Sequence, residues 1–156
     1  MKSPKKVKVK PYGFTLFCDD LREEVGGKTT YVGVYGDAMY VKPELPFQLP
    51  KLHLAIHIFN EPGKIFKTLK IQIAIPGDDA EKPGIEFDVD ENQLIKEKTP
   101  DVADEPTQMR THIALKLGMI PFPIKDYGRL RVSALWNGDY VSLGSLAIAP
   151  APKSDS

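Results

Sequence analysis

The sequence predicts an all-β fold with little helix, and three observations lead to that prediction. Short runs in which apolar and polar residues alternate recur along the whole chain, and this period of two is typical of half-buried strands. Glycine, proline, asparagine and aspartate separate these runs, as expected for the turns between strands. About eight or nine such runs, joined by frequent turns and a proline-rich crossover, favour two packed sheets.

The first predicted hairpin spans residues 14–35. Residues 14–18 are strand formers on both alternating faces, so this strand should be covered on both sides. Residues 30–35 alternate again, and Gly26-Gly27 supplies the turn between the two strands. The charged piece Asp20–Glu23 fits either a single capped helical turn or an irregular excursion. We expect the excursion, because one helical turn is marginal without packing.

The remaining strands follow from the same alternation. In residues 52–59 the even-numbered apolar residues face the core, whereas His53, Ala55, His57 and Phe59 face outward. The proline-rich residues 42–51 are predicted to be a linker whose apolar side chains, Leu45, Phe47 and Leu49, plug the core. The strands are predicted at residues 38–41, 52–59, 67–75, 84–89, 108–117, 129–136 and 140–148, with one helical turn within residues 93–98.

The last predicted hairpin carries the strongest local signal in the chain. Asn137-Gly138 fits the two-residue type I′ turn that joins tight antiparallel strands. The apolar phase slips in the final strand, and a β-bulge at Gly144-Ser145 explains the slip. The sequence therefore predicts one antiparallel β-sandwich of about eight strands, immunoglobulin-like or C2-like, in residues 13–149. It is flanked by a basic tail at residues 1–12 and a C-terminal tail at 150–156.

The apolar segment 119–124 is predicted to be a loop, because two prolines interrupt it. Its ring, Phe122, either plugs one open end of the sandwich or projects as an anchor for a partner. Large exposed apolar patches are rare on soluble monomers, which favours the plug. If the loop is exposed, its candidate partner contacts are Met119, Phe122 and Ile124.

Composition narrows the functional classes. Formal net charge is zero, with 21 basic and 21 acidic residues, which argues against bulk nucleic-acid binding. Lysines at the N-terminus fit a solubilising tail better than a specific phosphate-binding arm. The single cysteine, Cys18, excludes an intramolecular disulfide. No signal peptide and no apolar run long enough to span a membrane is found, so we expect a cytoplasmic protein.

A resemblance covers most of the chain and is most specific in its first third. Phe17-Cys18-Asp19-Asp20, Arg22 and Glu24, Gly26-Gly27-Lys28 and Val32-Gly33-Val34-Tyr35 resemble the opening signature of a family of uncharacterised bacterial proteins. Members of that family begin with a strand, a D-x-x-R-x-E segment, GGK and a GV[FY] strand. The resemblance implies a small β-sandwich of unknown function, without any activity, cofactor or catalytic residue.

No arrangement of histidines predicts a metal centre. His53 and His57 share one face of one strand, but four residues of strand place them about 13 Å apart. His112 is predicted on a neighbouring strand, where it pairs with one of them and makes two ligands at most. A closed structural zinc site needs four ligands.

Acidic residues and the cysteine likewise predict no metal or catalytic site. Residues 88–92 resemble the start of a calcium loop, but Gln93 and Thr99 stand where that loop needs glycine and glutamate. Cys18 has acidic neighbours, which raise a thiol pKa, so we interpret it as a core residue. Acidic turn residues at the ends of the sandwich leave calcium binding open as an alternative, although solvated turn carboxylates are favoured: Asp19, Asp20, Asp37, Asp78 and Asp79.

No phosphate-binding loop, nucleophile elbow or kinase signature is present. The leading hypothesis is therefore a non-enzymatic module that binds an unknown protein partner or takes part in assembly, without a cofactor. The alternative is a calcium- or lipid-responsive sandwich that binds through its end loops. An enzyme with an unrecognised carboxylate site is the least favoured hypothesis.

Overall fold

The structure is a computed structural model that describes residues 8–42, 44–79, 81–94 and 110–153. Within these residues the chain is all-β, with eleven strands and one short 3₁₀ turn. This confirms the predicted class, although the strands exceed the eight or so expected. The elements are β1 (Tyr12–Glu24), β2 (Lys28–Val34), β3 (Ala38–Val41), β4 (Phe47–Leu49), β5 (Leu52–Asn60), β6 (Leu69–Ala74), β7 (Ile85–Asp88), η1 (Glu91–Gln93), β8 (Thr111–Met119), β9 (Phe122–Ile124), β10 (Gly128–Trp136) and β11 (Asp139–Pro150).

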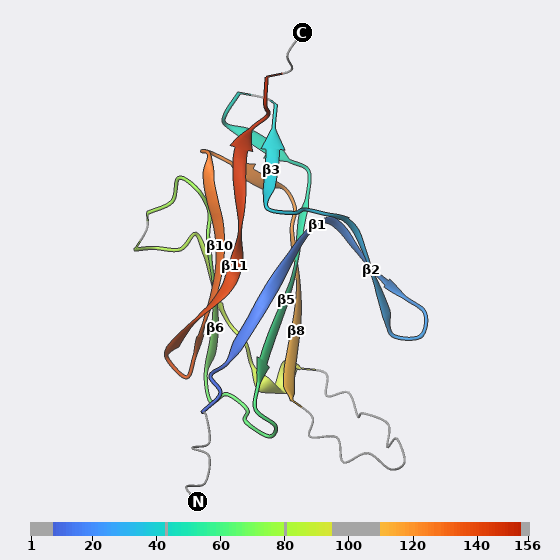
Figure 1. Cartoon of the computed structure of the whole chain (residues 1–156), viewed down its shortest axis with the longest axis vertical. Helices are drawn as coiled ribbons and strands as arrows, with labels where there is room; N and C mark the ends of the chain where they lie inside the picture. The colour runs from blue at the N-terminus through green and yellow to red at the C-terminus, as the bar shows by residue number, and fades with distance from the viewer. Residues whose placement is uncertain (1–7, 43, 80, 95–109, 154–156) are drawn as a thin grey trace, which may run out of the picture.

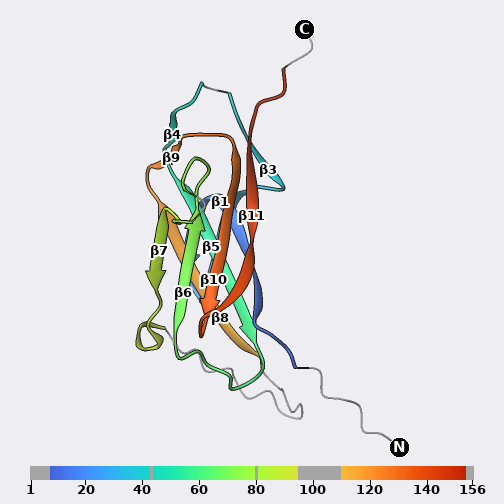
Figure 2. The ribbon, with the colours of Figure 1, turned by 90° about the vertical axis from the view of Figure 1, so that its left-hand side faces the viewer.

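Two sheets form a sandwich-like body (Figures 1 and 2). The first, here called sheet A, has the strand order β2-β1-β5-β8, and the second, sheet B, has the order β3-β11-β10-β6-β7. Pairing is antiparallel except between β3 and β11, which run parallel. A small third sheet joins β4 and β9 at one end of the body.

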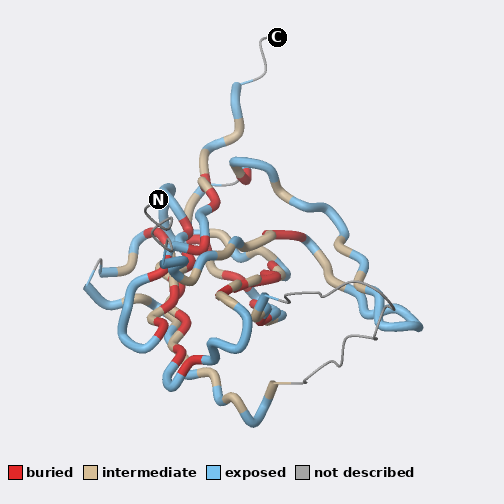
Figure 3. Tube along the Cα trace, turned by 60° about the horizontal axis from the view of Figure 1, so that its bottom comes forward, coloured by how far each residue is buried: buried red, intermediate tan, exposed pale blue. Residues whose placement is uncertain are grey.

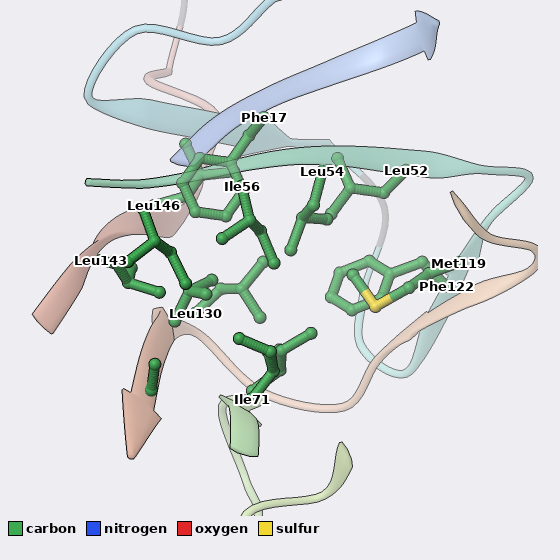
Figure 4. Packing of buried hydrophobic residues seen from close by; sticks show 14 of the residues in the cluster. Phe17, Leu52, Leu54, Ile56, Ile71, Met119, Phe122, Leu130, Leu143 and Leu146 are labelled. Atoms are coloured by element: carbon green, nitrogen blue, oxygen red, sulfur yellow. The ribbon is translucent and has the colours of Figure 1, made fainter. Parts of the chain in front are cut away.

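The core lies between the two sheets, where alternate side chains of each strand meet. Leu54, Ile56 and Ile58 of β5 are fully buried and belong to one cluster with Ile71 of β6 and Leu130 of β10. Figure 4 shows Leu54 and Ile56 converging with Ile71 and Leu130 of the other sheet. The inward phase predicted for residues 52–59 is therefore confirmed. Ala55 points outward as predicted, but it is buried because Leu16 and Lys116 flank it in the register.

The charged segment after Cys18 is a strand, so the predicted irregular excursion is wrong. β1 continues without interruption to Glu24, and its second half pairs only with β2. This half and β2 form a two-stranded projection, residues 19–34, that we call the arm. Figure 3 shows the arm as a largely exposed extension. The charged residues are compatible with strand structure because the arm has no buried face that would exclude them.

The segment 119–124 is also not a loop. Met119 ends β8, and Phe122–Ile124 forms β9, which pairs with β4 in the register Leu49 opposite Phe122. The short ladder tolerates the prolines, since only Pro123 lies within it, opposite Gln48, and removes a single donor, whereas Pro121 precedes β9. Half-buried Phe47 and Leu49 pack against the core as plugs, as predicted, but they belong to β4 and not to a linker.

The last hairpin is confirmed in detail. Asn137 and Gly138 both have positive φ, 50° and 84°, as a type I′ turn requires. The register shifts between Arg131 and Ser133 of β10, and the extra residue opposite that step lies at Leu143-Gly144 of β11. The predicted bulge is therefore present, one residue earlier than expected.

A 3₁₀ turn, η1, lies at Glu91–Gln93, so it shares only Gln93 with the turn predicted at residues 93–98, and Asp90 caps it by accepting a hydrogen bond from the Asn92 amide. The remainder of that prediction, beyond residue 94, lies outside the described residues. Thr99 of the calcium-like loop, residues 108 and 109 of the predicted strand 108–117, and most of the predicted basic tail also lie outside the described residues.

Candidate functional site

The outer face of sheet A carries two rows of stacked rings. Register places Tyr12 of β1 opposite Phe59 of β5, and Phe59 opposite His112 of β8. The ring centroids in this first row are 5.5 Å and 4.5 Å apart, with interplanar angles of 22° and 9°. In the second row Phe14 stacks on His57 at 4.9 Å and 19°. We call these five residues the ring face.

The rings of the ring face present their edges to solvent. The centroid separations match the ~4.8 Å between neighbouring strands, so the rings stack along the direction in which the strands pair. Nearly parallel rings stacked in that direction stand upright on the sheet. Ring edges carry the positive end of the aromatic quadrupole, so the face favours acceptor groups. Tyr12 and Phe14 remain 41% and 45% exposed.

A hydrogen bond between two histidines joins the two rows. His57 Nδ1 lies 2.9 Å from His112 Nε2, so one nitrogen donates and the other accepts. The predicted pairing of His112 with one of the β5 histidines is thus confirmed. His53 is separate, with Nδ1 3.3 Å from the Asp19 carbonyl oxygen. Two ligands at most are therefore brought together, and the described residues contain no group of three metal-ligating side chains.

Cations border the ring face. Arg110 donates a hydrogen bond to the Tyr12 hydroxyl, and its guanidinium carbon lies 5.9 Å from the centroid of the Tyr12 ring. Among the described residues no carboxylate forms an ion pair with Arg110, Lys8 or Lys10. On the other side Lys116 Nζ contacts Glu23 Oε1 at 2.9 Å, which connects β8 to the arm. Arg110 therefore places a positive charge beside Tyr12 at the edge of the ring face.

The pKa of the His57 imidazole is lowered from its ordinary value of 6.5. The main cause is burial among the rings, and nearby His112 and Lys116 also disfavour a positive charge. A lowered pKa means that the unfolded chain binds the extra proton first. Stability contributed by neutral His57 is present above the unfolded value of 6.5 and is lost as pH falls through the folded pKa.

We therefore expect the free energy of unfolding to decrease as pH falls below about 6.5, and part of that decrease to disappear in His57→Phe. Chemical denaturation at pH values on either side of this range measures the effect. His53→Phe is the matched control, since it removes a histidine of the same strand outside the ring face. Equal pH dependence in wild type and His57→Phe would contradict this assignment.

The other titratable candidates belong to local structure. Cys18 is fully buried, as predicted, and burial followed by the charges of Asp19 and Asp20 raises its pKa. Asp19 accepts a hydrogen bond of 2.7 Å from Tyr35, and burial together with this bond raises the pKa of the Tyr35 hydroxyl. Asp20 forms ion pairs with Lys51 and Arg22. Neither the Cys18 thiol nor the Tyr35 hydroxyl is arranged for nucleophilic chemistry.

The acidic residues considered for calcium do not converge. Asp78 lies 3.9 Å from Lys125, and Asp79 accepts a hydrogen bond from the Glu81 amide. Together with the partners of Asp19 and Asp20, these contacts distribute the carboxylates over different parts of the described structure. No observation therefore favours the calcium-responsive alternative.

The candidate contact residues of segment 119–124 are in the core. Met119, Phe122 and Ile124 are 8%, 0% and 1% exposed, and Figure 4 shows Met119 and Phe122 side by side. This burial agrees with the plug alternative and leaves the three side chains no free surface for a partner. The candidate site consequently lies on sheet A and not at this end.

A hollow of about 450 Å³ lies between sheet B and the end of sheet A. Its walls are mostly apolar, with Ile75, Ile85, Leu117 and Phe122 among them, and Asp78 and Lys125 also line it. The Asp78 Oδ2 atom is buried without a hydrogen-bond partner in the described structure, facing the Cα of Gly84. Since this oxygen faces the backbone at Gly84 and not the space of the hollow, the hollow offers a ligand fewer specific polar contacts than the ring face does.

Sequence reasoning placed His57 and Phe59 on the outer face of their strand but missed the ring face as a unit. Alternation of Tyr12 with Phe14 and of His57 with Phe59 was the available signal.

Comparison with known proteins adds no assignment: no protein-family model, no curated protein and no solved structure matches the chain. No helix in the described residues is long and apolar enough to cross a membrane.

Proposed function

We propose that this chain is a non-enzymatic protein-binding module that contacts its partner through the ring face. One observation supports this most strongly: two rows of stacked, partly exposed rings lie on the outside of a sheet whose other face is the core. Partly exposed aromatic residues are enriched at the centres of protein interfaces. The assignment to an immunoglobulin-like or C2-like sandwich is likewise a proposal.

The chemistry of the ring face indicates the kind of partner. Upright rings offer their positively polarised edges, and Arg110 adds a cation that has no carboxylate partner among the described residues. Both features complement acceptor groups. We therefore propose a partner segment that combines acidic side chains with apolar ones, so that carboxylates meet Arg110 and apolar groups cover Phe14 and Phe59.

Affinity capture from cells that express the protein natively tests this proposal. The wild-type chain is compared with Phe14→Ser, which removes an exposed ring of the ring face. Tyr140→Ser is the matched control, since Tyr140 is 69% exposed on β11 of the other sheet. We expect wild type and Tyr140→Ser to retain the same partner and Phe14→Ser to lose it.

Thermal melting of both variants must match that of wild type, so that loss of binding is not loss of folding. Added salt should weaken retention, because the proposed contact includes charge attraction that ions screen. Retention of one set of proteins by all three chains, or the same loss in both variants, would contradict the proposed role of the ring face.

A further inference from the structure

The four edge strands of the two main sheets differ in how they are protected from pairing with another chain. β3 and β7 are four residues each, and β7 carries Glu86 and Asp88. β8 has Lys116 in its second half. Short length and edge charges of this kind discourage edge-to-edge association. β2 is less protected, because it is seven residues long, has no proline, and carries its one charge, Lys28, at its first position.

Within the described residues the outer edge of β2 pairs with no other strand, and the arm that carries this open edge is largely exposed. The arm leaves the body after Cys18, where β1 stops pairing with β5 and pairs with β2 alone (Figures 1 and 3). Val32 and Val34 are 38% and 48% exposed, and Val25 at the tip is 95% exposed. A two-stranded hairpin is marginally stable by itself, so a third strand on this edge would stabilise the arm.

The register of the arm shows which backbone groups face the open edge. The ladder ends at the pair Glu24 and Lys28, joined by Val25-Gly26-Gly27. Glu24 and Lys28 are therefore a hydrogen-bonded pair, in which each backbone N–H donates to the C=O of the other residue, because the three loop residues form no further pair. Hydrogen-bonded and non-hydrogen-bonded pairs alternate in antiparallel ladders, so Arg22 and Thr30 are also hydrogen-bonded to each other. The backbone N–H and C=O groups of Thr29 and Tyr31 therefore point away from β1.

We propose that the open edge of β2 pairs with β2 of a second copy of this chain, antiparallel and around a two-fold axis at Thr30. In that register Thr29 of each chain faces Tyr31 of the other, so the outward N–H and C=O groups of both residues are satisfied. Lys28 faces Val32 of the other chain, and no two like charges meet. Threonine with tyrosine and threonine with threonine are favourable cross-strand pairs. The strand is thus self-complementary in its hydrogen bonds and its charge.

This inference is independent of the proposed function. The ring face lies on the half of sheet A where β1 pairs with β5, whereas the arm carries the proposed contact between copies. A dimer would present two ring faces on one continuous sheet. Two linked sites raise the apparent affinity for a partner that offers two matching segments.

Sedimentation velocity over a concentration series tests the proposal first. We expect wild type to shift from monomer to dimer as concentration rises, and Thr30→Lys to remain monomeric with an unchanged melting temperature. The substitution places two ammonium groups opposite each other at the two-fold axis, where like charges destabilise pairing. A wild-type chain that stays monomeric throughout would overturn the proposal.

Cysteine cross-linking tests the register directly. Across the two-fold axis the two Thr30 Cβ atoms would lie about 4.5–5.5 Å apart, close to the range that a disulfide needs. Under mild oxidation we expect Thr30→Cys to form a covalent dimer. Val25→Cys is the control, since it is more exposed but lies at the tip, away from the axis. Equal cross-linking of both variants would show random collision and overturn the proposed pairing.

Discussion

Phe122→Ala is expected to destabilise the protein by about 3–5 kcal/mol, because it removes a fully buried ring and leaves a cavity. For a domain of this size the melting temperature should fall by roughly 6–20 °C. β9 holds Phe122 opposite Leu49 of β4, so the surroundings are two paired strands that cannot easily collapse into the space. Thermal and chemical denaturation measure the loss.

The control is Ile120→Ala in the same connection between β8 and β9. Ile120 is 68% exposed, so its truncation should change the free energy of unfolding by less than about 0.5 kcal/mol. If the two variants melt alike, Phe122 does not plug the sandwich, and its segment becomes a candidate contact surface again.

Gly13→Ala is expected to be nearly as damaging, through overpacking and not through a cavity. A Cβ atom at position 13 would lie 2.0 Å from the His57 carbonyl oxygen and 2.8 Å from the Leu143 Cδ2 atom. The first of these is a backbone atom of the neighbouring strand, which cannot move without disturbing the ladder. Forced overpacking usually costs about 1–3 kcal/mol, and the backbone clash places this variant at the upper end.

Gly36→Ala is the matched control, because no heavy atom lies within 4 Å of a Cβ built at that position. Denaturant unfolding of the two variants should separate them clearly, with Gly36→Ala close to wild type. A stable Gly13→Ala protein would mean that β1 and β5 approach less closely than the structure shows.

Local sequence patterns predicted most of the strands because burial on one face enforces the alternation. Leu54, Ile56 and Ile58 are fully buried in the phase that their sequence indicates, and Asn137-Gly138 forms the expected turn. The sequence pattern did not predict the arm, because the strands of the arm have no buried face to enforce alternation. Asp19–Glu24 is held in a strand by pairing with β2, and no buried face leaves a pattern in its sequence.

The ring face could not be predicted from the sequence for a different reason. His57 and His112 are 55 residues apart in the sequence, and their hydrogen bond depends on the register between β5 and β8. A shift of one residue in either pairing would turn one of the rings into the core. Local alternation predicts on which face of the sheet a side chain lies, but it does not predict which residue of the adjacent strand lies beside it.

We expect the partner to bind at the ring face. Photo-crosslinking in cells that express the protein natively tests it most directly, with a photoreactive amino acid incorporated at position 14 or, separately, at position 140. We expect a discrete cross-linked complex from position 14 and none from position 140. Cross-links from position 140 alone would place the partner on sheet B and contradict binding at the ring face.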